Sequence, residues 1–230
     1  MASTGLYAFN PAISNLTLLA FGRIQIRRTE ITPQHLADAD LESNFVQVAM
    51  GNRQPILWRQ EIVEIPLLIS DPEYDLPTRM IAVRDAYIST TISSVTTDNV
   101  VWPLSPSEYD ALPNKTLEAP PQSYLITKTL TPTVKTWPVA DVSSRYTLKL
   151  RILSQIQDAS LINGTTLDMP YRALDIFVAG LAHRLARIYK PELEAARKQD
   201  YADAWTDFAN TDVEDGISLY VSPSFQAYYR

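Results

Sequence analysis

The chain has 230 residues, of which 46% are hydrophobic and 20% are charged, and its formal net charge is −6. Such a chain can bury a sizeable core, and its acidic balance argues against a nucleic-acid binder that works by neutralising phosphates. The absence of cysteine excludes disulfides and thiolate metal sites, and no apolar run reaches the length needed to cross a bilayer.

Residues 13–52 predict two helices. The first starts at Ile13 and carries apolar residues at helical spacing. The second begins at Thr32-Pro33, which supplies an N-cap hydroxyl and a proline at the first helical position, and it runs to about Met50. One face of this second helix carries the apolar residues Ala37, Leu41, Phe45 and Val48.

The middle of the chain, residues 53–160, changes to the sequence period of β-structure. Sixteen prolines against six glycines in the whole chain favour short strands with stiff connections. Ser105 and Glu108 have the spacing of a capping box around Pro106, which predicts a short helix over residues 106–112. Alternating or β-branched segments predict strands at residues 57–58 and 61–65, 79–89, 100–102, 123–127, 133–137 and 145–152.

Residues 165–210 predict a second pair of helices, which meet at Lys190-Pro191 because proline suits the first position of a new helix. The first of them has apolar residues at Leu174, Phe177, Val178, Leu181, Leu185 and Ile188. We expect an α+β fold in which the helices of 13–52 and 165–210 form a four-helix bundle. Residues 53–160 are then a β-rich insertion between the second and third helices.

Residues 211–230 predict an extended C-terminal arm. Ile217, Leu219 and Val221 alternate with polar residues or with Tyr220, as in a strand, and Phe225, Tyr228 and Tyr229 follow almost at the end. Aromatic side chains are costly to leave in water and are enriched at interfaces. Two interpretations stay open: the arm packs on the β region of its own chain, or it docks on another subunit by strand addition.

The sequence offers little that predicts catalysis. Motifs for nucleotide binding, zinc hydrolysis and serine nucleophiles are missing. His35 and His183 lie on predicted helices, and we expect both to be solvated surface residues. The carboxylates Asp38, Asp40 and Glu42 predict a solvated helix face, because alternate helical positions do not face each other. We therefore expect no enzyme, no cofactor and no metal site.

The start of the chain, MASTGLYAFN, lacks the basic and apolar regions of a signal peptide. We expect a product of the cytoplasm.

The order of these parts resembles the head–tail adaptor family of short-tailed bacteriophages, over roughly residues 13–210. The resemblance lies in the collinear order of several short segments. They are Asp40-Leu41-Glu42-Ser43-Asn44-Phe45, Ser107-Glu108-Tyr109 with Lys115 and Pro120-Pro121, Thr136-Trp137-Pro138, Leu167-Asp168-Met169-Pro170-Tyr171, and Ala179-Gly180-Leu181-Ala182-His183-Arg184-Leu185-Ala186 with Tyr189.

The resemblance implies a structural virion protein of the neck or tail, assembled in the cytoplasm of the bacterial host. It implies a homo-oligomeric ring of twelve copies that binds the portal protein and offers a platform to a tail nozzle or tube protein. DNA would pass through the lumen without specific binding, and no membrane is involved. The residues expected to contact the portal or a neighbouring subunit are Ile217, Leu219, Tyr220, Val221, Phe225, Tyr228, Tyr229, Arg172, Arg184 and Arg187.

Two alternatives remain beside the adaptor. A tail nozzle or tube component would stack on tail proteins without a portal, but the helical pair argues against it because tubes consist mostly of sheet. A carbohydrate- or receptor-binding module on a helical base would use Trp58, Trp102 and Trp137 as a platform for sugar rings. Packing within the β region explains these tryptophans more simply.

Overall fold

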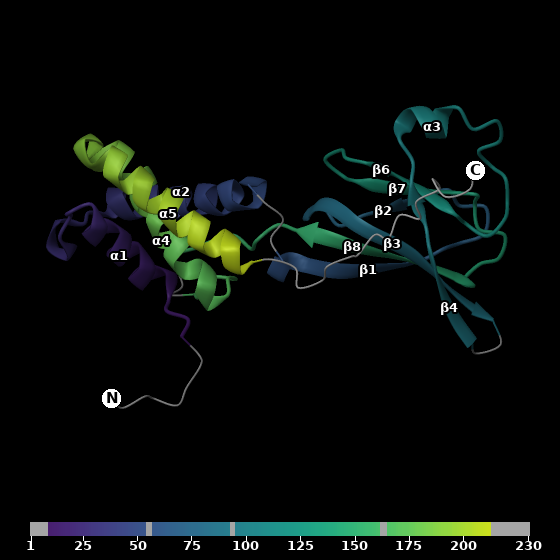
Figure 1. Ribbon diagram of the computed structural model, residues 1–230, viewed down its shortest axis with the longest axis horizontal. Helices are drawn as coiled ribbons and strands as arrows, with labels where there is room; N and C mark the ends of the chain where they lie inside the picture. Colours follow the sequence, from purple (N-terminus) through teal and green to yellow (C-terminus); the bar gives the residue numbers. More distant parts are fainter. Residues whose placement is uncertain (1–8, 54–56, 93–94, 162–164, 213–230) are drawn as a thin grey trace, which may run out of the picture.

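The structure is a computed structural model that describes residues 9–53, 57–92, 95–161 and 165–212. A helical lobe and a β lobe lie side by side, and the chain passes from the first to the second and back again (Figure 1). The helical lobe consists of α1 (Ile13–Arg23), α2 (Pro33–Arg53), α4 (Leu174–Tyr189) and α5 (Glu194–Thr211).

Helix α4 is the centre of the helical lobe. Six consecutive residues, from Ile176 to Leu181, are almost fully buried, and Leu185 follows them on the next turns. A helix that is apolar on all sides needs neighbours all round. Helices α1, α2 and α5 supply them, because each packs against α4.

The fold class is α+β, but the predicted four-helix bundle is wrong. The described part of the chain contains five α-helices and two four-stranded sheets. In a bundle the helices share a core that lies between them, whereas here three helices surround the fourth. The reason is that α4 is buried on all sides from Ile176 to Ala182 and not along one stripe only.

Helix α2 is turned the opposite way from the orientation that a bundle requires. Its buried residues are Ala39, Ser43, Val46, Gln47 and Met50, two of which are polar. Its most apolar stripe faces solvent, with Leu41 59%, Phe45 47% and Val48 58% exposed. The helical period of this segment was therefore predicted correctly, but the face that the chain itself covers is the other one.

The β lobe is a pair of sheets that share one core. The first sheet has the order β1-β8-β3-β4 and is antiparallel throughout. Its strands are β1 (Gln60–Pro66), β8 (Tyr146–Ser154), β3 (Met80–Ile92) and β4 (Val95–Val100). The second sheet has the order β2-β7-β6-β5, with β5 parallel to β6. Its strands are β2 (Glu73–Asp75), β7 (Thr133–Trp137), β6 (Ser123–Thr127) and β5 (Trp102–Pro103).

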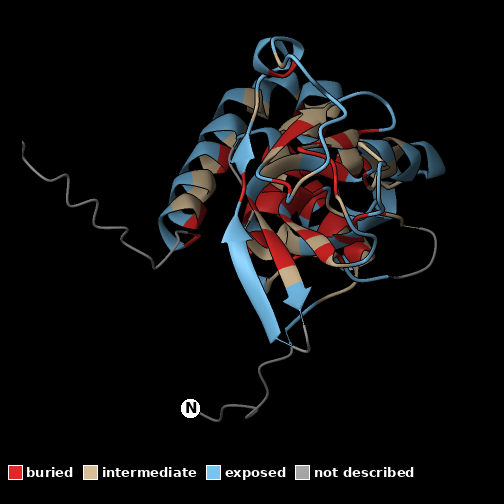
Figure 2. Ribbon diagram, turned by 90° about the vertical axis from the view of Figure 1, so that its right-hand side faces the viewer, coloured by how far each residue is buried: buried red, intermediate tan, exposed pale blue. Residues whose placement is uncertain are grey.

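The central strand β8 supplies much of this second core. Leu148, Leu150 and Ile152 are fully buried at alternate positions, as the sequence pattern predicts. Val134 of β7 and Tyr124 of β6 join the same cluster from the other sheet. By contrast, β4 is exposed along its whole length, and the hairpin of β3 and β4 extends away from the body of the lobe (Figures 1 and 2).

Local signals in the sequence located most elements. The two strands at 123–127 and 133–137 have the predicted bounds. Helix α3 (Pro106–Asp110) begins with the predicted capping box, because the Ser105 amide donates to Glu108 (2.7 Å) and the Glu108 amide donates to Ser105 (3.3 Å). This hydrogen bonding lowers the pKa of the Glu108 carboxyl.

The differences in the β region are local. The segment at 57–58 is part of a 3-10 turn (Leu57–Arg59) and not a strand. The predicted strand at 100–102 is divided between β4 and β5, because the buried Val101 turns inward between two exposed neighbours. Strand β2 was missed, since its three residues follow a proline turn and have no alternating pattern.

Candidate interaction site

The predicted arm begins at a clamp between the two lobes. The Asp212 side chain is 0% exposed, and its carboxylate accepts hydrogen bonds from Arg172 (2.7 Å) and from the Leu57 amide (3.3 Å). The guanidinium of Arg172 also lies 5.8 Å from the ring centroid of Trp58. Trp58 contacts Phe208 of α5 edge to face, with ring centroids 5.7 Å apart. The end of α5 is thereby fixed to the segment that leads into β1.

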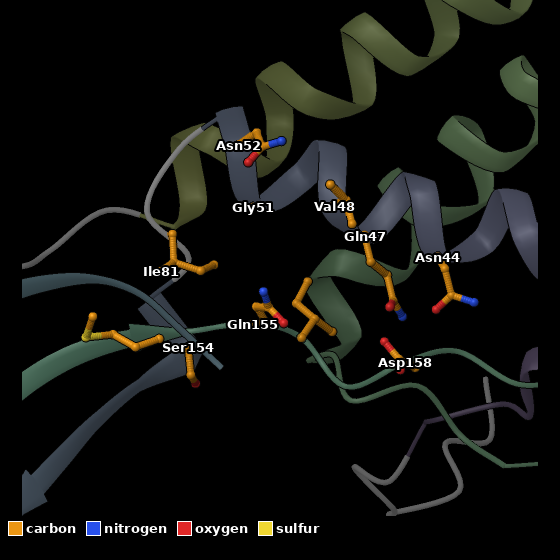
Figure 3. A pocket seen from close by; sticks show the side chains of 11 residues that line it. Asn44, Gln47, Val48, Gly51, Asn52, Ile81, Ser154, Gln155 and Asp158 are labelled. Atoms are coloured by element: carbon orange, nitrogen blue, oxygen red, sulfur yellow. The ribbon is translucent and has the colours of Figure 1, made fainter. Parts of the chain in front are cut away.

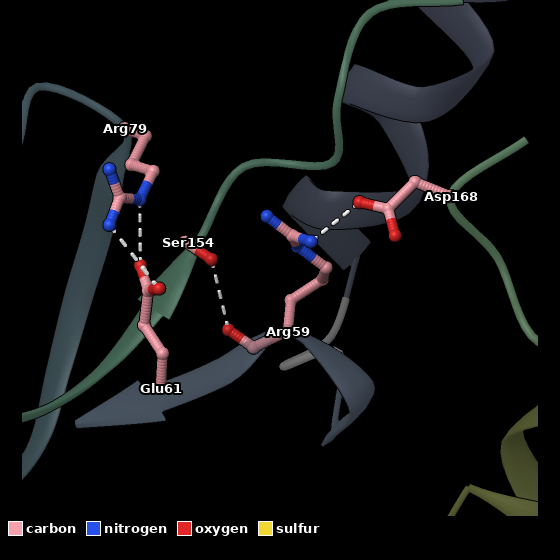
Figure 4. A network of polar contacts seen from close by, with 5 residues as sticks. All are labelled: Arg59, Glu61, Arg79, Ser154 and Asp168. Carbon is pink, nitrogen blue, oxygen red and sulfur yellow. Dashed lines mark hydrogen bonds and ion pairs between the residues drawn. The ribbon is translucent and has the colours of Figure 1, made fainter.

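A polar network lies beside this clamp, where β1 starts (Figure 4). Arg59 forms an ion pair with Asp168, on the segment before α4, at 2.5 Å. The carbonyl of Arg59 accepts a hydrogen bond from Ser154 at the end of β8 (3.2 Å). Glu61 binds Arg79 through two contacts of 2.8 and 3.3 Å, and this bonding lowers the pKa of the Glu61 carboxyl. The network joins the helical lobe to the first sheet.

The predicted contact residues separate into groups. Arg172 belongs to the clamp, whereas Arg184 and Arg187 of α4 lie together at a surface hollow of about 320 Å³. Arg184 pairs with Glu42 of α2 at 3.0 Å, and Arg187 lies 3.5 Å from Glu194 of α5. Arg187 is the most exposed of the three, at 60% of its side chain. The arm residues Ile217, Leu219, Tyr220, Val221, Phe225, Tyr228 and Tyr229 lie outside the described residues.

The acidic residues of α2 bind the body of their own chain, so the predicted solvated face is wrong. Asp38 accepts a hydrogen bond from the Tyr189 hydroxyl, and burial together with this bond raises the pKa of Tyr189 to about 12. Asp40 accepts one from the Leu161 amide at 2.8 Å, and Glu42 holds Arg184. The three acids lie on different sides of α2, and each is partly buried because it binds a different donor of the same chain.

The expectation of two solvated histidines is also wrong. His183 is only 17% exposed at its side chain and stacks on Tyr201 of α5, with ring centroids 6.3 Å apart. Burial lowers the pKa of the His183 imidazole. His35 is half-buried and contacts Tyr189, with ring centroids 4.4 Å apart. Both histidines thus pack between helices.

The three tryptophans do not form a common platform. Trp58 packs on the helical core, while Trp102 and Trp137 belong to β5 and β7 of the second sheet. Trp137 donates its indole N–H to the carbonyl of Asn114 at 2.9 Å. Only two of the three side chains could meet one ligand, which weakens the sugar-binding interpretation.

Sequence reasoning missed the clamp and the network because their partners are far apart in the chain. Asp212 and Arg172 are 40 residues apart, and Arg59 and Asp168 are 109 residues apart. The sequence around Asp212 gives no indication of a buried carboxylate. In the parts of the chain that the structure describes, no helix is long and apolar enough for a membrane span. Within the same parts, no cluster of three or more potential metal ligands occurs.

The comparison with known protein families gives one result that covers most of the chain. Residues 17–221 match the family described as SU10 adaptor protein. A search of curated proteins finds no match. Because the family match extends over much more than half of the 230 residues, the chain belongs to the SU10 adaptor proteins, a family of phage head–tail adaptors.

Proposed function

We propose that this protein forms a closed ring of twelve copies between the portal and the tail of a bacteriophage, and that DNA passes through its lumen. Membership of an adaptor family makes the chain a structural component of the virion that associates with portal and tail proteins. The observation that carries the proposal is the match over residues 17–221, which includes both lobes and the start of the arm.

The proposal assigns a task to each part of the chain. The helices of residues 13–52 and 165–210 form the core of each ring subunit, and the β region of 53–160 faces tail proteins. A ring requires two different surfaces on each subunit, since a heterologous contact must repeat until it closes. An acidic protein also suits a conduit, because DNA must slide past it without binding.

The C-terminal arm is the proposed portal contact. The Asp212 clamp gives the arm a fixed point of departure at the junction of the two lobes. Beyond it, the alternating Ile217, Leu219 and Val221 suit addition to a sheet edge, and the terminal aromatic residues suit apolar pockets. Arg172 acts by holding the clamp, and Arg184 and Arg187 are proposed contacts with portal or neighbour.

Removal of residues 217–230 tests the arm. We expect the truncated protein to keep its circular dichroism spectrum and its melting temperature, because Asp212 and its partners remain. Its affinity for the purified portal should fall at least tenfold in a sedimentation or interferometry assay, which is about 1.4 kcal/mol.

The matched control keeps the full length of the arm. Ile217, Leu219 and Val221 are replaced by serine together, so that only the apolar side chains are lost. This variant should bind the portal as weakly as the truncated one if side-chain contacts hold the arm. Undiminished affinity of the truncated protein contradicts the proposed role of the arm.

A further inference from the structure

Helix α2 carries an apolar surface that the described residues leave largely exposed, although the Arg184 guanidinium lies 5.7 Å over the ring of Phe45. We call Leu41, Phe45 and Val48 the α2 surface; these residues follow one another at helical spacing on the solvent side. Scattered exposed apolar residues are normal, but a continuous stripe on a helix marks a contact site. The stripe is more apolar than the buried face, which contains Ser43 and Gln47.

The polar contacts of α2 fix this orientation. Asp40 and Glu42 are held by Leu161 and Arg184 of the same chain, so α2 cannot rotate to bury its stripe without breaking them. Asn44 adds two contacts with Ala159, at 3.1 Å and 2.8 Å. The fold thus holds the α2 surface outward by specific bonds, and the described residues leave it exposed.

A cavity of about 330 Å³ adjoins the end of the α2 surface, between α2 and the start of the β lobe (Figure 3). Val48 belongs to both, and Ile81 and Ile156 add apolar walls. Gln47 also lines the cavity; it is only 5% exposed, and its amide nitrogen has no hydrogen-bond partner. A buried donor without an acceptor is costly, so the face that α2 turns inward is less favourable to bury than its exposed apolar stripe.

The outer face of α1 offers a surface of matching length. The α2 surface from Leu41 to Val48 spans about 10 Å at 1.5 Å per residue, and the outer face of α1 from Asn15 to Gly22 spans about the same. We call the open hollow of about 800 Å³ along this face the α1 hollow. Its lining includes Leu18, Leu19, Gly22, Gln25, Arg27 and Arg28.

The packing of the described residues does not require glycine at position 22 in this hollow. A Cβ atom at this position would meet nothing within 4 Å. The left-handed backbone position after α1 is occupied by Gln25, with φ 63°, so Gly22 is not needed to end the helix. Glycine costs helix stability, by about 1 kcal/mol relative to alanine, and it permits close approach of another backbone. The space around Gly22 therefore leaves room for another backbone to approach α1 closely.

The two surfaces also differ in charge. The first half of α2 carries Asp38, Asp40 and Glu42 and no lysine or arginine. Arg184 balances the charge of Glu42, whereas Asp38 and Asp40 are bonded to a hydroxyl and a backbone amide and keep their negative charge. At the rim of the α1 hollow, Arg27 and Arg28 are exposed, and neither side chain forms an ion pair within the described residues. Complementary charges of this kind orient two surfaces and favour one register over others.

We infer that the α2 surface of one copy packs in the α1 hollow of the next copy, as the contact that builds the ring. The α2 surface and the α1 hollow lie on two helices that each pack on α4, and both are exposed in the described chain, so the single chain does not join them. Two different surfaces make the contact heterologous, which is the geometry of a closed ring. The inference rests on the proposed ring and identifies the faces that form it.

Two pairs of substitutions test the inference in the full-length chain. Leu41→Glu with Val48→Glu places charges on the α2 surface, and Leu19→Glu with Gly22→Glu places them in the α1 hollow. All four positions are exposed or open, so neither variant should melt at a lower temperature than the wild type. The matched control is Leu130→Glu with Val95→Glu, at positions 98% and 64% exposed in the β lobe.

Ring yield is measured by electron microscopy and mass photometry, on the chain alone and with purified portal. We expect either helical variant to lose at least about tenfold in complete rings, while the control assembles like the wild type. In a mixture of the two helical variants, the intact α2 surface of the α1 variant can still pack in the intact α1 hollow of the α2 variant. The mixture should therefore give pairs but no rings. If α2 packed on α2 of another copy instead, the α1 variant alone would form pairs, and this result would contradict the inference.

The outcomes separate this inference from the proposed function. Complete rings of both helical variants on the portal overturn the inference and leave the proposed ring intact. The α2 variant could also form normal rings that no longer bind a tail protein. That result would show that the α2 surface binds the tail protein and not the next copy, and it would overturn the inference. A wild type that forms no ring, alone or on the portal, overturns the proposed function itself.

Discussion

At the scale of single residues, His183 shows how packing changes a side chain that the sequence places on the surface. It stands between Ala182 and Arg184, off the apolar stripe of its helix. The structure nevertheless covers it with Tyr201, because α4 has neighbours on more sides than one stripe can indicate. Desolvation disfavours the imidazolium form and lowers the pKa, although Glu194, 3.9 Å away, acts in the opposite direction.

The stability of the protein should therefore fall as the pH falls below 6.5. In that range the unfolded chain binds a proton at residue 183 and the folded chain does not, so protonation favours unfolding until the folded pKa is reached. Urea denaturation at a series of pH values measures this slope. A His183→Gln variant should show a smaller slope between pH 6.5 and 5.

The same prediction can be checked directly by NMR, since the chain has only two histidines. His183→Gln assigns the ring signals, and His35→Gln is the reciprocal control. A His183 signal that titrates at or above 6.5 contradicts the burial argument.

At the scale of elements, the packing of α4 depends on one small residue. A Cβ atom on Gly180 would lie 3.0 Å from Cε2 of Tyr201 in α5 and 3.1 Å from Cγ1 of Val46 in α2. Both neighbours are buried, so they have little room to move. Gly180 thus sets how closely two helices approach the central one.

Replacement of Gly180 by alanine should lower the free energy of unfolding by about 1–3 kcal/mol through overpacking. Gly22→Ala is the matched control, because its Cβ would meet open space, and it should raise stability by about 0.5–1 kcal/mol. Urea denaturation of both variants in dilute solution measures the two changes. Equal effects of the two substitutions would show that helix propensity, not packing, decides the outcome.

Elements were predictable from sequence where the signal is local. The alternation in β8, the Thr32 cap of α2 and the capping box of α3 each involve residues within a few positions of one another. The sequence did not predict which face of α2 is buried. The spacing of apolar residues shows that a helix has an apolar face, but it does not show whether the same chain or another molecule covers that face. The Asp212 clamp was also beyond reach, since its partners come from distant segments.

At the scale of the whole molecule, composition and the order of elements predicted an α+β chain with strands in its middle. They did not predict that the helices surround α4, nor that the strands form two sheets over a core of their own. Of the proposed contact residues, the structure places the three arginines and joins each to an acidic partner in the same chain. The α2 surface and the α1 hollow emerge only when both lobes are in place.

The central claim is that this chain forms a ring on the portal, and electron microscopy of the full-length protein tests it most directly. Samples of the chain with and without purified portal are imaged side by side and classified for symmetry. The account predicts a closed ring of twelve copies on the portal, with the end of each chain directed towards it. The absence of rings in both samples, or copies bound to the portal singly and without contact to one another, contradicts it.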